Sequence, residues 1–274
     1  MSRPTVSIIT PTFNASATIT HCLESVARQT YRPIEHWIID GRSTDATSSI
    51  VKELSQKYDH IRYVSEPDQG IYDAMNKGIA LTQGDWLYFL GGDDSLYTDH
   101  VLTEIFGQEF HLEQDVLYGD VFSTRFGGVY DGPFDEVKIF QQNICHQALF
   151  FRKTVFQTTG LFDLRFKIYA DWDHNIKWFL NGELRSQYLP VMVANYADNG
   201  LSSTNSEASF IDKRPFLFLS YDQGVLSRKW KARLTKIAAK LCLKQGDVVG
   251  FAKYFLLYAR LTLATSSGKR LCTY

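Results

Sequence analysis

Short apolar runs alternate with amphipathic stretches along the first 90 residues. The runs that read as strands lie at residues 6–9, 34–39, 61–64 and 86–90. After the first run, Ile19, Cys22, Leu23 and Val26 recur at the spacing of an amphipathic helix, and similar stretches follow the second and third runs. This order favours right-handed crossovers, so the pattern predicts an α/β fold with a mainly parallel, Rossmann-like central sheet flanked by helices.

The fourth run ends in residues that can carry chemistry. Residues 87–90 are apolar, as in a strand buried on both faces, and Gly91, Gly92, Asp93 and Asp94 follow directly. Two adjacent carboxylates at a strand end repel each other unless a cation or hydrogen-bond donors neutralise them. Paired carboxylate oxygens suit Mg²⁺ or Mn²⁺ ions that bridge substrate phosphates. The alternative interpretation is a Gly-Gly-Asp-Asp surface turn.

Polar side chains also end the other three predicted strands. They are Thr10, Pro11 and Thr12 after the first run, Asp40 after the second, and Glu66 and Asp68 after the third. Because the carboxyl ends of parallel strands meet at one edge of a sheet, these side chains are expected to converge on one cleft with Asp93 and Asp94. The sequence lacks both the G-x-G-x-x-G loop and the Walker loop, so carboxylates and a metal ion would hold a nucleotide here.

Four ordered motifs of the chain resemble family 2 glycosyltransferases. They are SIITPTFN at 7–14, IDGRSTD at 39–45, EPDQGIYDAMNKG at 66–78 and GGDD at 91–94. The resemblance covers roughly residues 5–205. It implies a GT-A fold and the transfer of a sugar, with inversion, from a nucleotide-sugar donor to an acceptor hydroxyl.

The resemblance also implies roles for individual residues. The predicted nucleotide-binding set is Thr10, Pro11, Thr12, Asn14, Asp40, Asp68, Gly70 and Asp93. Gly91 stands where the first Asp of the family's D-x-D motif is often found, so Asp93 is assigned to the ribose and Asp94, with Asp93 beside it, to a divalent cation (Mn²⁺ or Mg²⁺). Contacts to the sugar or the acceptor are expected from Asp73, Asn76, Gly92, His146, Gln147, Trp172 and Asp173.

The catalytic base is expected in segment 169–175. Asp171 matches the family position of the base, which takes the acceptor hydroxyl's proton as the oxygen attacks the anomeric carbon opposite the leaving nucleotide. Asp173 is the second choice. The metal ion would offset charge on the departing diphosphate, and no enzyme nucleophile is needed. The structural alternatives are a helix cap for the Asp residues, and core positions for Trp172 and His146.

Charge divides the chain into two parts. Residues 223–274 carry eleven Lys and Arg residues against one acidic residue, a net charge of +10 that leaves −11 for the first 222 residues. The predicted organisation is a GT-A catalytic domain over 1–205, with a nucleotide-binding half (1–97) and an acceptor-side half (98–205), and a basic amphipathic helical extension over 206–274. A polar loop at 199–203 would end the catalytic domain.

The basic extension predicts a contact with an anionic surface. Its apolar stripe consists of Leu234, Ile237, Ala238 and Leu241. Basic residues accompany this stripe, which favours an anionic membrane surface. The alternative is a stripe that packs on its own domain.

Cysteine usage and hydropathy predict the location of the protein. The four cysteines lie far apart, without a C-x-x-C pair, at Cys22, Cys145, Cys242 and Cys272. This spacing argues against a zinc site or a disulfide framework and fits a reducing cytosol. No apolar signal segment is seen at the start, and residues 248–264 contain Lys253 and Arg260, so they make a poor transmembrane span. The expected location is cytoplasmic, with peripheral association at the inner face of the membrane.

The expected partners are a UDP-sugar in preference to a GDP-sugar, and a saccharide or lipid-linked acceptor, with no nucleic acid. One alternative is a sugar-phosphate nucleotidyltransferase, although residues 10–14 lack the Gly-rich, Arg-bearing loop of that class. The other is a non-catalytic nucleotide-sugar-binding or scaffolding protein. Such a protein would have no need of the acidic residues Asp40, Asp93, Asp94 and Asp171.

Overall fold

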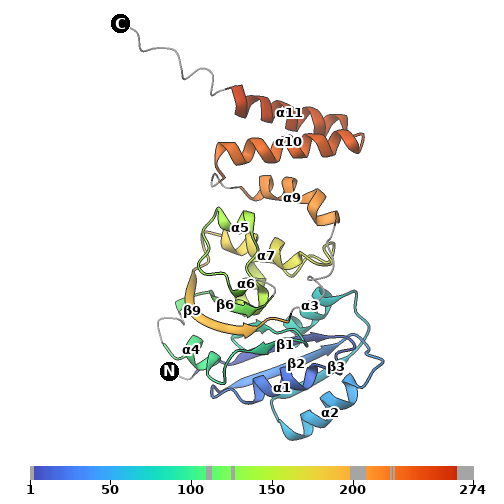
Figure 1. Cartoon of the computed structure of the whole chain (residues 1–274), viewed down its shortest axis with the longest axis vertical. Coiled ribbons are helices and arrows are strands. Elements are labelled where there is room, and N and C mark those ends of the chain that lie inside the picture. Colours follow the sequence, from blue (N-terminus) through green and yellow to red (C-terminus); the bar gives the residue numbers. More distant parts are fainter. Residues whose placement is uncertain are drawn as a thin grey trace.

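The computed structural model describes residues 3–108, 113–124, 127–197, 208–222, 224 and 226–263. Its strands are β1 (Val6–Thr12), β2 (Ile34–Asp40), β3 (Ile61–Ser65), β4 (Trp86–Phe89), β5 (Ser95–Leu96), β6 (Val116–Ser123), β7 (Gly128–Tyr130), β8 (Leu149–Arg152) and β9 (Ser186–Asn195). Its helices are α1 (Ile19–Ala27), α2 (Thr47–Lys57), α3 (Ile71–Leu81), α4 (Val101–Phe106), α5 (Lys138–Gln141), the 3-10 helix η2 (His146–Ala148), α6 (Lys153–Thr159), α7 (Ala170–Phe179), α9 (Ala208–Tyr221), α10 (Arg228–Lys244) and α11 (Val248–Leu263). Within these residues the strands form one sheet in the order β3-β2-β1-β4-β8-β6-β9-β5, with β7 beside β6 (Figure 1).

The first half of the sheet is parallel. β1 lies between β2 and β4 and is parallel to both, and β3 is parallel to β2, which confirms the predicted strands and crossovers. β1 continues past its predicted end, because Pro11 and Thr12 pair with Ile39 and Asp40. The pairing of β4 with β1 stops at Ile9, so Pro11 lies where β1 has a neighbour on one side only, a position that tolerates its missing N–H.

Helices cover both faces of this parallel half. Ile8 packs in one apolar cluster with Cys22 of α1, and its neighbour Ile9 packs in another with Met75 and Ile79 of α3. Successive strand residues point to opposite faces, so β1 needs apolar side chains at both positions. Figure 1 shows α1 and α2 on one side of the sheet and α3, α6 and α7 on the other. The packing on both sides fixes the strand ends.

The second half of the sheet is mixed. β8 is antiparallel to β4 and to β6, β9 is parallel to β6, and β5 is antiparallel to β9. The predicted α/β fold with a helical C-terminal region is confirmed, and the all-parallel part of the sheet consists of β1 to β4, which are joined by crossover helices. Within segment 145–151, the short helix η2 precedes the strand β8. The polar residues His146 and Gln147 therefore lie in a turn.

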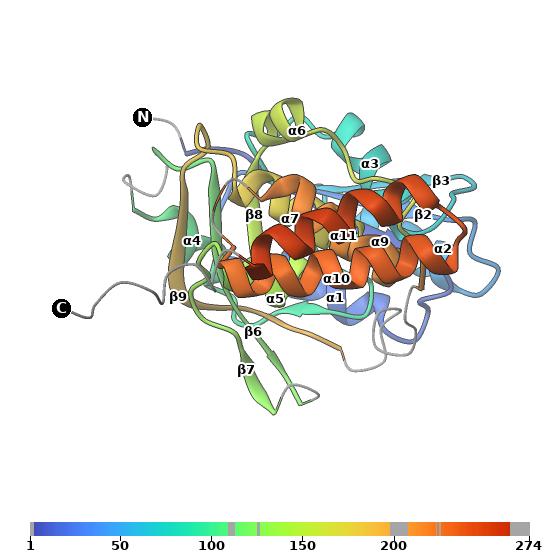
Figure 2. The ribbon, with the colours of Figure 1, turned by 90° about the horizontal axis from the view of Figure 1, so that it is seen from above.

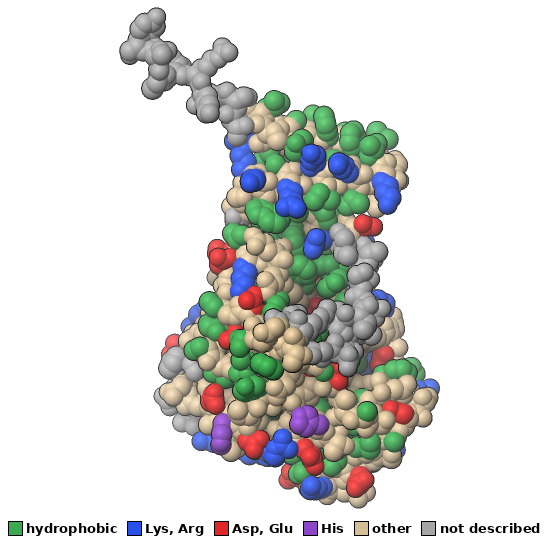
Figure 3. Space-filling model, in the orientation of Figure 1, with side chains coloured by type: hydrophobic (Ala, Val, Ile, Leu, Met, Phe, Trp, Pro, Cys, Tyr) green, Lys and Arg blue, Asp and Glu red, His purple; other side chains and the backbone are tan. Residues whose placement is uncertain are grey.

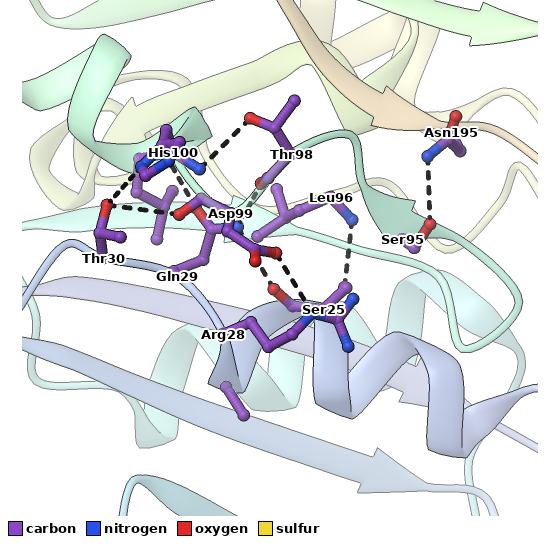
Figure 4. A network of polar contacts seen from close by, with 12 residues as sticks. Ser25, Arg28, Gln29, Thr30, Ser95, Leu96, Thr98, Asp99, His100 and Asn195 are labelled. Carbon is purple, nitrogen blue, oxygen red and sulfur yellow. Dashed lines mark hydrogen bonds and ion pairs between the residues drawn. The ribbon is translucent and has the colours of Figure 1, made fainter.

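A polar network ties the segment after Asp94 to the end of α1 (Figure 4). The Ser25 hydroxyl accepts a hydrogen bond from the Leu96 N–H at 3.1 Å, and the Gln29 amide donates to the Thr98 carbonyl at 2.6 Å. Arg28 pairs with Asp99 at 3.2 Å, which adds an exposed ion pair to the network. These contacts hold the residues that follow β4 in place beneath the strand ends.

The C-terminal helices stack on the α7 side of the sheet. Phe210 of α9 packs on Phe166, Tyr169 and Trp172, with ring centroids 4.9 to 5.7 Å apart. α10 and α11 form a hairpin at the end of the long axis opposite the parallel sheet (Figures 1 and 2). The predicted loop at 199–203 and the domain boundary at 205 lie outside the described residues.

The predicted apolar stripe of α10 is largely covered by its own chain. Leu234 is 5% exposed and Ala238 is fully buried, whereas Ile237 is 38% exposed. The stripe therefore packs inward, as in the second interpretation drawn from the sequence. None of the helices in the described part of the chain has the length and hydropathy of a membrane span.

Candidate active site

Asp171 lies at the junction of two adjoining pockets. It stands in the first turn of α7, is 7% exposed and lines both pockets. The first pocket also contains Asp93 and Asp94. The second pocket, with a volume of about 210 Å³, contains Asn143 and Trp172. A carboxylate in this shared wall can reach groups bound on either side.

Three donors surround the Asp171 carboxylate. Its Oδ1 accepts a hydrogen bond from the Trp172 backbone N–H at 2.8 Å and lies 2.9 Å from the Tyr72 hydroxyl. That hydroxyl is also within hydrogen-bond distance of the Ile168 carbonyl oxygen. The Asn143 amide donates to Asp171 Oδ2 at 2.9 Å. These contacts fix the orientation of the carboxylate and leave Oδ2 with the fewer protein donors.

His146, one of the expected sugar or acceptor contacts, stands beside Asp171. Its Nδ1 is 3.5 Å from Asp171 Oδ2, and it lines both pockets. Its Nε2 is buried and has no hydrogen-bond partner among the described residues. A buried ring nitrogen without a partner is costly unless a ligand or water satisfies it.

Asp93 and Asp94 line the same pocket but differ in environment. Asp93 is exposed, whereas Asp94 is 3% exposed. Asp94 Oδ1 accepts from the Ala197 N–H at 2.8 Å, and its Oδ2 accepts from the Gln147 amide at 2.6 Å. Burial, and then the charge of Asp93, raises the pKa of Asp94 to about 6. Asp94 therefore ties the end of β4 to η2 and to the end of β9.

Gly91 lies directly against these carboxylates. A Cβ at this position would come within 2.5 Å of Asp94 Oδ2 and 2.9 Å of Asp93 Oδ1. A side chain here would have to displace Asp94 from its two donors. Glycine at position 91 therefore leaves the space that the Asp93 and Asp94 carboxylates occupy.

Asp40 is buried among donors at the end of β2. It is 1% exposed and accepts from the Tyr63 hydroxyl at 3.0 Å and the Ser65 hydroxyl at 2.6 Å. The Ser43 N–H donates to both of its oxygens, at 3.1 and 3.2 Å. Asp40 thus shapes the loop that follows β2.

Thr10 and Thr12 occupy different places at the end of β1. The Thr10 hydroxyl is buried, 2.8 Å from His36 Nε2, so it faces the interior. The Thr12 hydroxyl is buried with no hydrogen-bond partner among the described residues. Gly92 lies close by, since a Cβ there would meet the Thr12 hydroxyl at 3.0 Å. The predicted ends of β1 and β4 therefore do come together.

Contacts join the loops after β1, β2 and β3, but the predicted residues Thr12, Asp40 and Asp68 do not line the pocket that contains Asp93 and Asp94. Asn14 takes a left-handed conformation, with φ of 51°, and its side-chain oxygen accepts from the Thr44 N–H at 2.8 Å. Asp68 Oδ1 accepts a hydrogen bond from the Gly70 N–H at 2.9 Å. A Cβ on Gly41 would come within 2.4 Å of the other oxygen, Asp68 Oδ2.

Two predicted sugar contacts on α3 bind protein groups and lie outside the two pockets around Asp171. The Asn76 side chain exchanges two hydrogen bonds with the Phe162 backbone, at 2.9 and 3.1 Å. Asp73 accepts from the Gln69 N–H at 2.9 Å and lies 3.5 Å from Lys77. Neither Asn76 nor Asp73 lines the two pockets that Asp171 joins.

Asp173 lies away from the pockets around Asp171, whereas Trp172 lines the second pocket together with Asp171. Asp173 accepts from the Tyr221 hydroxyl at 2.9 Å and pairs with Lys177 at 2.6 Å, outside both pockets. Side chains two positions apart on an α-helix point to nearly opposite sides, so Asp173 points away from Asp171. The Trp172 indole lines the second pocket and donates to the Ile139 carbonyl at 2.8 Å.

Comparison with known proteins decides the family. The family model for glycosyl transferase family 2 matches residues 7–169. The chain belongs to this family. A PGL/p-HBAD biosynthesis glycosyltransferase of Mycobacterium bovis is 41% identical over 244 residues, which is 84% of this chain and 92% of that protein. Glycosyltransferase GlyA of Streptococcus pneumoniae is 27% identical over 236 residues, 82% of this chain and 32% of that protein.

Solved glycosyltransferase structures share the fold. S. aureus TarS 1-349, in complex with UDP-GlcNAc, aligns with a TM-score of 0.67 at 18% identity and covers 86% of this chain and 71% of that chain. The mannosyltransferase PcManGT from Pyrobaculum calidifontis, in complex with GDP-Man and Mn²⁺, aligns with a TM-score of 0.59 at 15% identity and covers 99% and 77%. The protein is thus a glycosyltransferase with the GT-A fold, and the nucleotidyltransferase alternative is wrong.

The acidic side chains of the first pocket suit a metal ion that is held by one carboxylate and completes its coordination with phosphates and waters. No group of three or more His, Cys, Asp or Glu side chains converges within the described part of the chain. Asp93 is nevertheless exposed in the first pocket, at the end of a buried strand. Mg²⁺ and Mn²⁺ commonly bind through one or two carboxylates, with phosphates and waters as the remaining ligands. Asp93 fits that arrangement.

Sequence reasoning missed the residues that orient Asp171. Tyr72 lies within the motif at 66–78, but among its neighbours only Asp73 and Asn76 are predicted site residues. Asn143 belongs to a stretch without clear periodicity. Lys167 and Tyr196, which line the first pocket, carried no motif signal either.

Proposed function

We propose that this glycosyltransferase is an inverting enzyme that moves a sugar from a nucleotide-sugar donor to an acceptor hydroxyl in glycolipid or surface-polysaccharide assembly. The observation that carries the proposal is the position of Asp171 between a pocket that contains Asp93 and a second pocket lined by aromatic side chains. Donor and acceptor would meet at this junction, with one carboxylate within reach of both.

Asp171 acts as the general base in this proposal. The acceptor oxygen gives its proton to Asp171 Oδ2 as it attacks the anomeric carbon, and the bond to the nucleotide breaks on the opposite face. The Tyr72 hydroxyl, the Asn143 amide and the Trp172 N–H hold the carboxylate in one orientation, so little reorganisation is needed. The single base is sufficient for inversion, because no covalent intermediate forms.

The nucleotide lies along the ends of β1, β2 and β4 in this proposal. Asp40, Thr12 and Asn14 border that edge, and Asp93 stands at its pocket end. The structural relatives are complexes with UDP-GlcNAc and with GDP-Man, so both nucleotides are candidates. A UDP-sugar is the preferred donor, as the resemblance of the motifs implies.

A divalent cation is proposed to bind with the donor. Asp93 would be the main ligand of this cation and Asp94 the secondary one, because Asp94 already accepts two hydrogen bonds from the protein. This order is the reverse of the one expected from the sequence. A bound Mn²⁺ or Mg²⁺ would supply positive charge to the departing diphosphate.

The acceptor is proposed to be a saccharide or a lipid-linked molecule in the second pocket. Tyr130, Tyr169 and Trp172 line it, and aromatic faces suit the apolar faces of sugar or aromatic rings. The M. bovis relative is named for PGL/p-HBAD biosynthesis, which supports a role in cell-envelope assembly. Cys22 and Cys145 are free thiols, in agreement with a cytoplasmic location.

The stereochemistry of the product tests the proposal. The purified chain is incubated with Mn²⁺ and UDP- and GDP-sugars that are α-linked to the nucleotide, and the product anomer is read by proton NMR at early times. The expected result is release of nucleoside diphosphate with a β-anomeric product. Release of an α-anomer would contradict inversion. No turnover of any donor, with or without saccharide acceptors, would favour the non-catalytic binding protein.

A further inference from the structure

An exposed apolar surface runs along α11. Its residues, here called the ridge, are Val248, Val249, Phe255, Leu256 and Leu263. Val249 is 81% exposed and Leu256 is 68% exposed. At 100° per residue the five positions fall on one side of the helix, and the other side faces α10. A contiguous exposed apolar face of this kind marks an interaction surface.

A basic groove adjoins the ridge. It lies between α10 and α11, has a volume of about 630 Å³ and is lined by the cations Arg228, Lys229, Arg233 and Lys236 together with Tyr258 of α11. No acidic side chain is among the described residues that line this groove. Figure 3 shows the basic side chains as a band along this end of the molecule, next to the apolar side chains of the last helix.

We propose that the α10–α11 hairpin docks this protein on a bilayer that contains anionic lipids. The ridge lies at the boundary of the acyl chains, and the cations of the groove contact lipid phosphates at the rim. Apolar burial and attraction to anionic headgroups act together in interfacial helices of this type. Long basic side chains beside an apolar face reach the headgroup level without leaving the helix surface.

Charge favours a bilayer over a second copy of the chain. The two helices carry nine Lys and Arg residues and no acidic residue, with Asp247 in the turn between them. A two-fold contact would bring the same basic band together from both copies, and like charges across an interface are unfavourable. An anionic leaflet complements both the ridge and the groove.

Docking is separable from catalysis. None of the residues that line the two pockets around Asp171 belongs to α10 or α11. The hairpin lies at the end of the long axis away from the parallel strands (Figure 1). Failure of the glycosyltransfer proposal would therefore leave this inference intact, and the reverse also holds.

Co-sedimentation of the full chain with vesicles tests the proposal. The vesicles are phosphatidylcholine alone or phosphatidylcholine with phosphatidylglycerol. One variant, Phe255→Ser with Leu256→Glu, breaks the ridge, and another, Arg233→Glu with Lys236→Glu, reverses charge in the groove. The matched control, Lys52→Glu with Lys57→Glu on exposed positions of α2, changes net charge by the same amount. Melting curves verify that every variant is folded.

The wild type and the α2 control are expected to sediment with anionic vesicles and to stay in solution with phosphatidylcholine alone. The groove variant should bind at least about 25-fold more weakly, because two cations are lost at about fivefold each and two negative charges are added. The ridge variant should lose binding at high salt as well as at low salt. Equal loss in the α2 control, or release by inorganic phosphate, would overturn bilayer docking. So would a vesicle-free dimer, seen by analytical ultracentrifugation, that Leu256→Glu dissolves.

Discussion

The Tyr72 hydroxyl lies 2.9 Å from Asp171 Oδ1, although the two residues are 99 positions apart in the chain. Tyr72 belongs to α3 in the parallel half of the sheet, and Asp171 belongs to α7. The contact links the part of the protein assigned to the nucleotide with the proposed base. Substitutions at Tyr72 therefore report on the orientation of Asp171.

Tyr72→Phe should lower kcat by about 10-fold and leave donor affinity within about twofold. The variant removes the contact of the hydroxyl with the charged Asp171, worth about 1.5 kcal/mol, and its contact with the Ile168 carbonyl, and keeps the buried ring in place. Steady-state kinetics on the preferred donor give the split between kcat and KM. An unchanged kcat would show that the hydroxyl has no part in orienting the base.

Asp93 and Asp94 should separate into a metal ligand and a structural residue. Calorimetric titration of UDP and of GDP, each with and without Mn²⁺, is expected to show binding only when the metal is present. Asp93→Asn should weaken that binding at least about 10-fold without changing stability. Asp94→Asn should lower the free energy of unfolding by about 2 kcal/mol, because it disturbs the buried contacts to Gln147 and Ala197.

The reverse outcome is equally informative. If Asp94→Asn removed metal-dependent binding while its stability stayed at the wild-type value, Asp94 would be the ligand, as the sequence first suggested. Gln147→Ala serves as the matched control, since it removes a donor to Asp94 and leaves both carboxylates.

Two buried histidines should make the fold sensitive to acid. Burial lowers the pKa of His36 and of His174 to about 3. In the unfolded chain each titrates near about 6.5, so below that pH the unfolded state binds protons that the folded state does not. The free energy of unfolding therefore falls as the pH drops from about 6.5 toward 3, by about 2 kcal/mol for each histidine at pH 5.

Urea denaturation between pH 5 and pH 8 measures this loss. In His174→Gln the loss of unfolding free energy that is assigned to this histidine should disappear. The free energy of unfolding should therefore fall less steeply with decreasing pH than in the wild type. The exposed His100→Gln is the control and should leave the slope unchanged. A slope that is identical in His174→Gln would refute the assignment.

Gly78 should resist replacement by alanine even though it lies inside α3. A Cβ at this position would come within 2.4 Å of Ile9 Cγ2 in the neighbouring strand. Alanine gains about 1 kcal/mol of helix propensity, but overpacking costs about 1–3 kcal/mol, so Gly78→Ala is expected to be destabilising or at best neutral. Gly182→Ala, which has open space, is the control, and thermal unfolding of both variants is the measurement.

The parallel half of the fold was predictable from the sequence because its strands are uninterrupted apolar runs. A run such as 86–90, buried on both faces, can take few other conformations in a chain of this composition. The polar strand ends then had to converge, and the structure does bring Thr12, Gly92 and Asp93 to one edge. The residues that orient Asp171 were not predictable, since Tyr72 and Asn143 reach it only through tertiary packing.

The surroundings of Asp94 and of Asp171 could not be predicted from local sequence patterns, because they depend on contacts between distant segments. His146 and Gln147 precede an aromatic run and read as strand, but they form a turn that places Gln147 on Asp94. The different environments of Asp93 and Asp94 arise from η2 and from Ala197 beyond β9, both distant in sequence. Asp171 and Asp173 likewise look equivalent until the helix is built, when one faces the pockets and the other faces Lys177.

The most direct test of the proposed catalytic centre is the turnover of Asp171→Asn beside its donor affinity. Asparagine keeps the size of the side chain but cannot accept the acceptor's proton, so kcat should fall by about 10²–10⁴-fold while the Kd of the nucleotide-sugar stays within about twofold. Asp173→Asn, on the opposite side of α7, should retain kcat. Turnover in Asp171→Asn close to that of the wild type would contradict the assignment of Asp171 as the base.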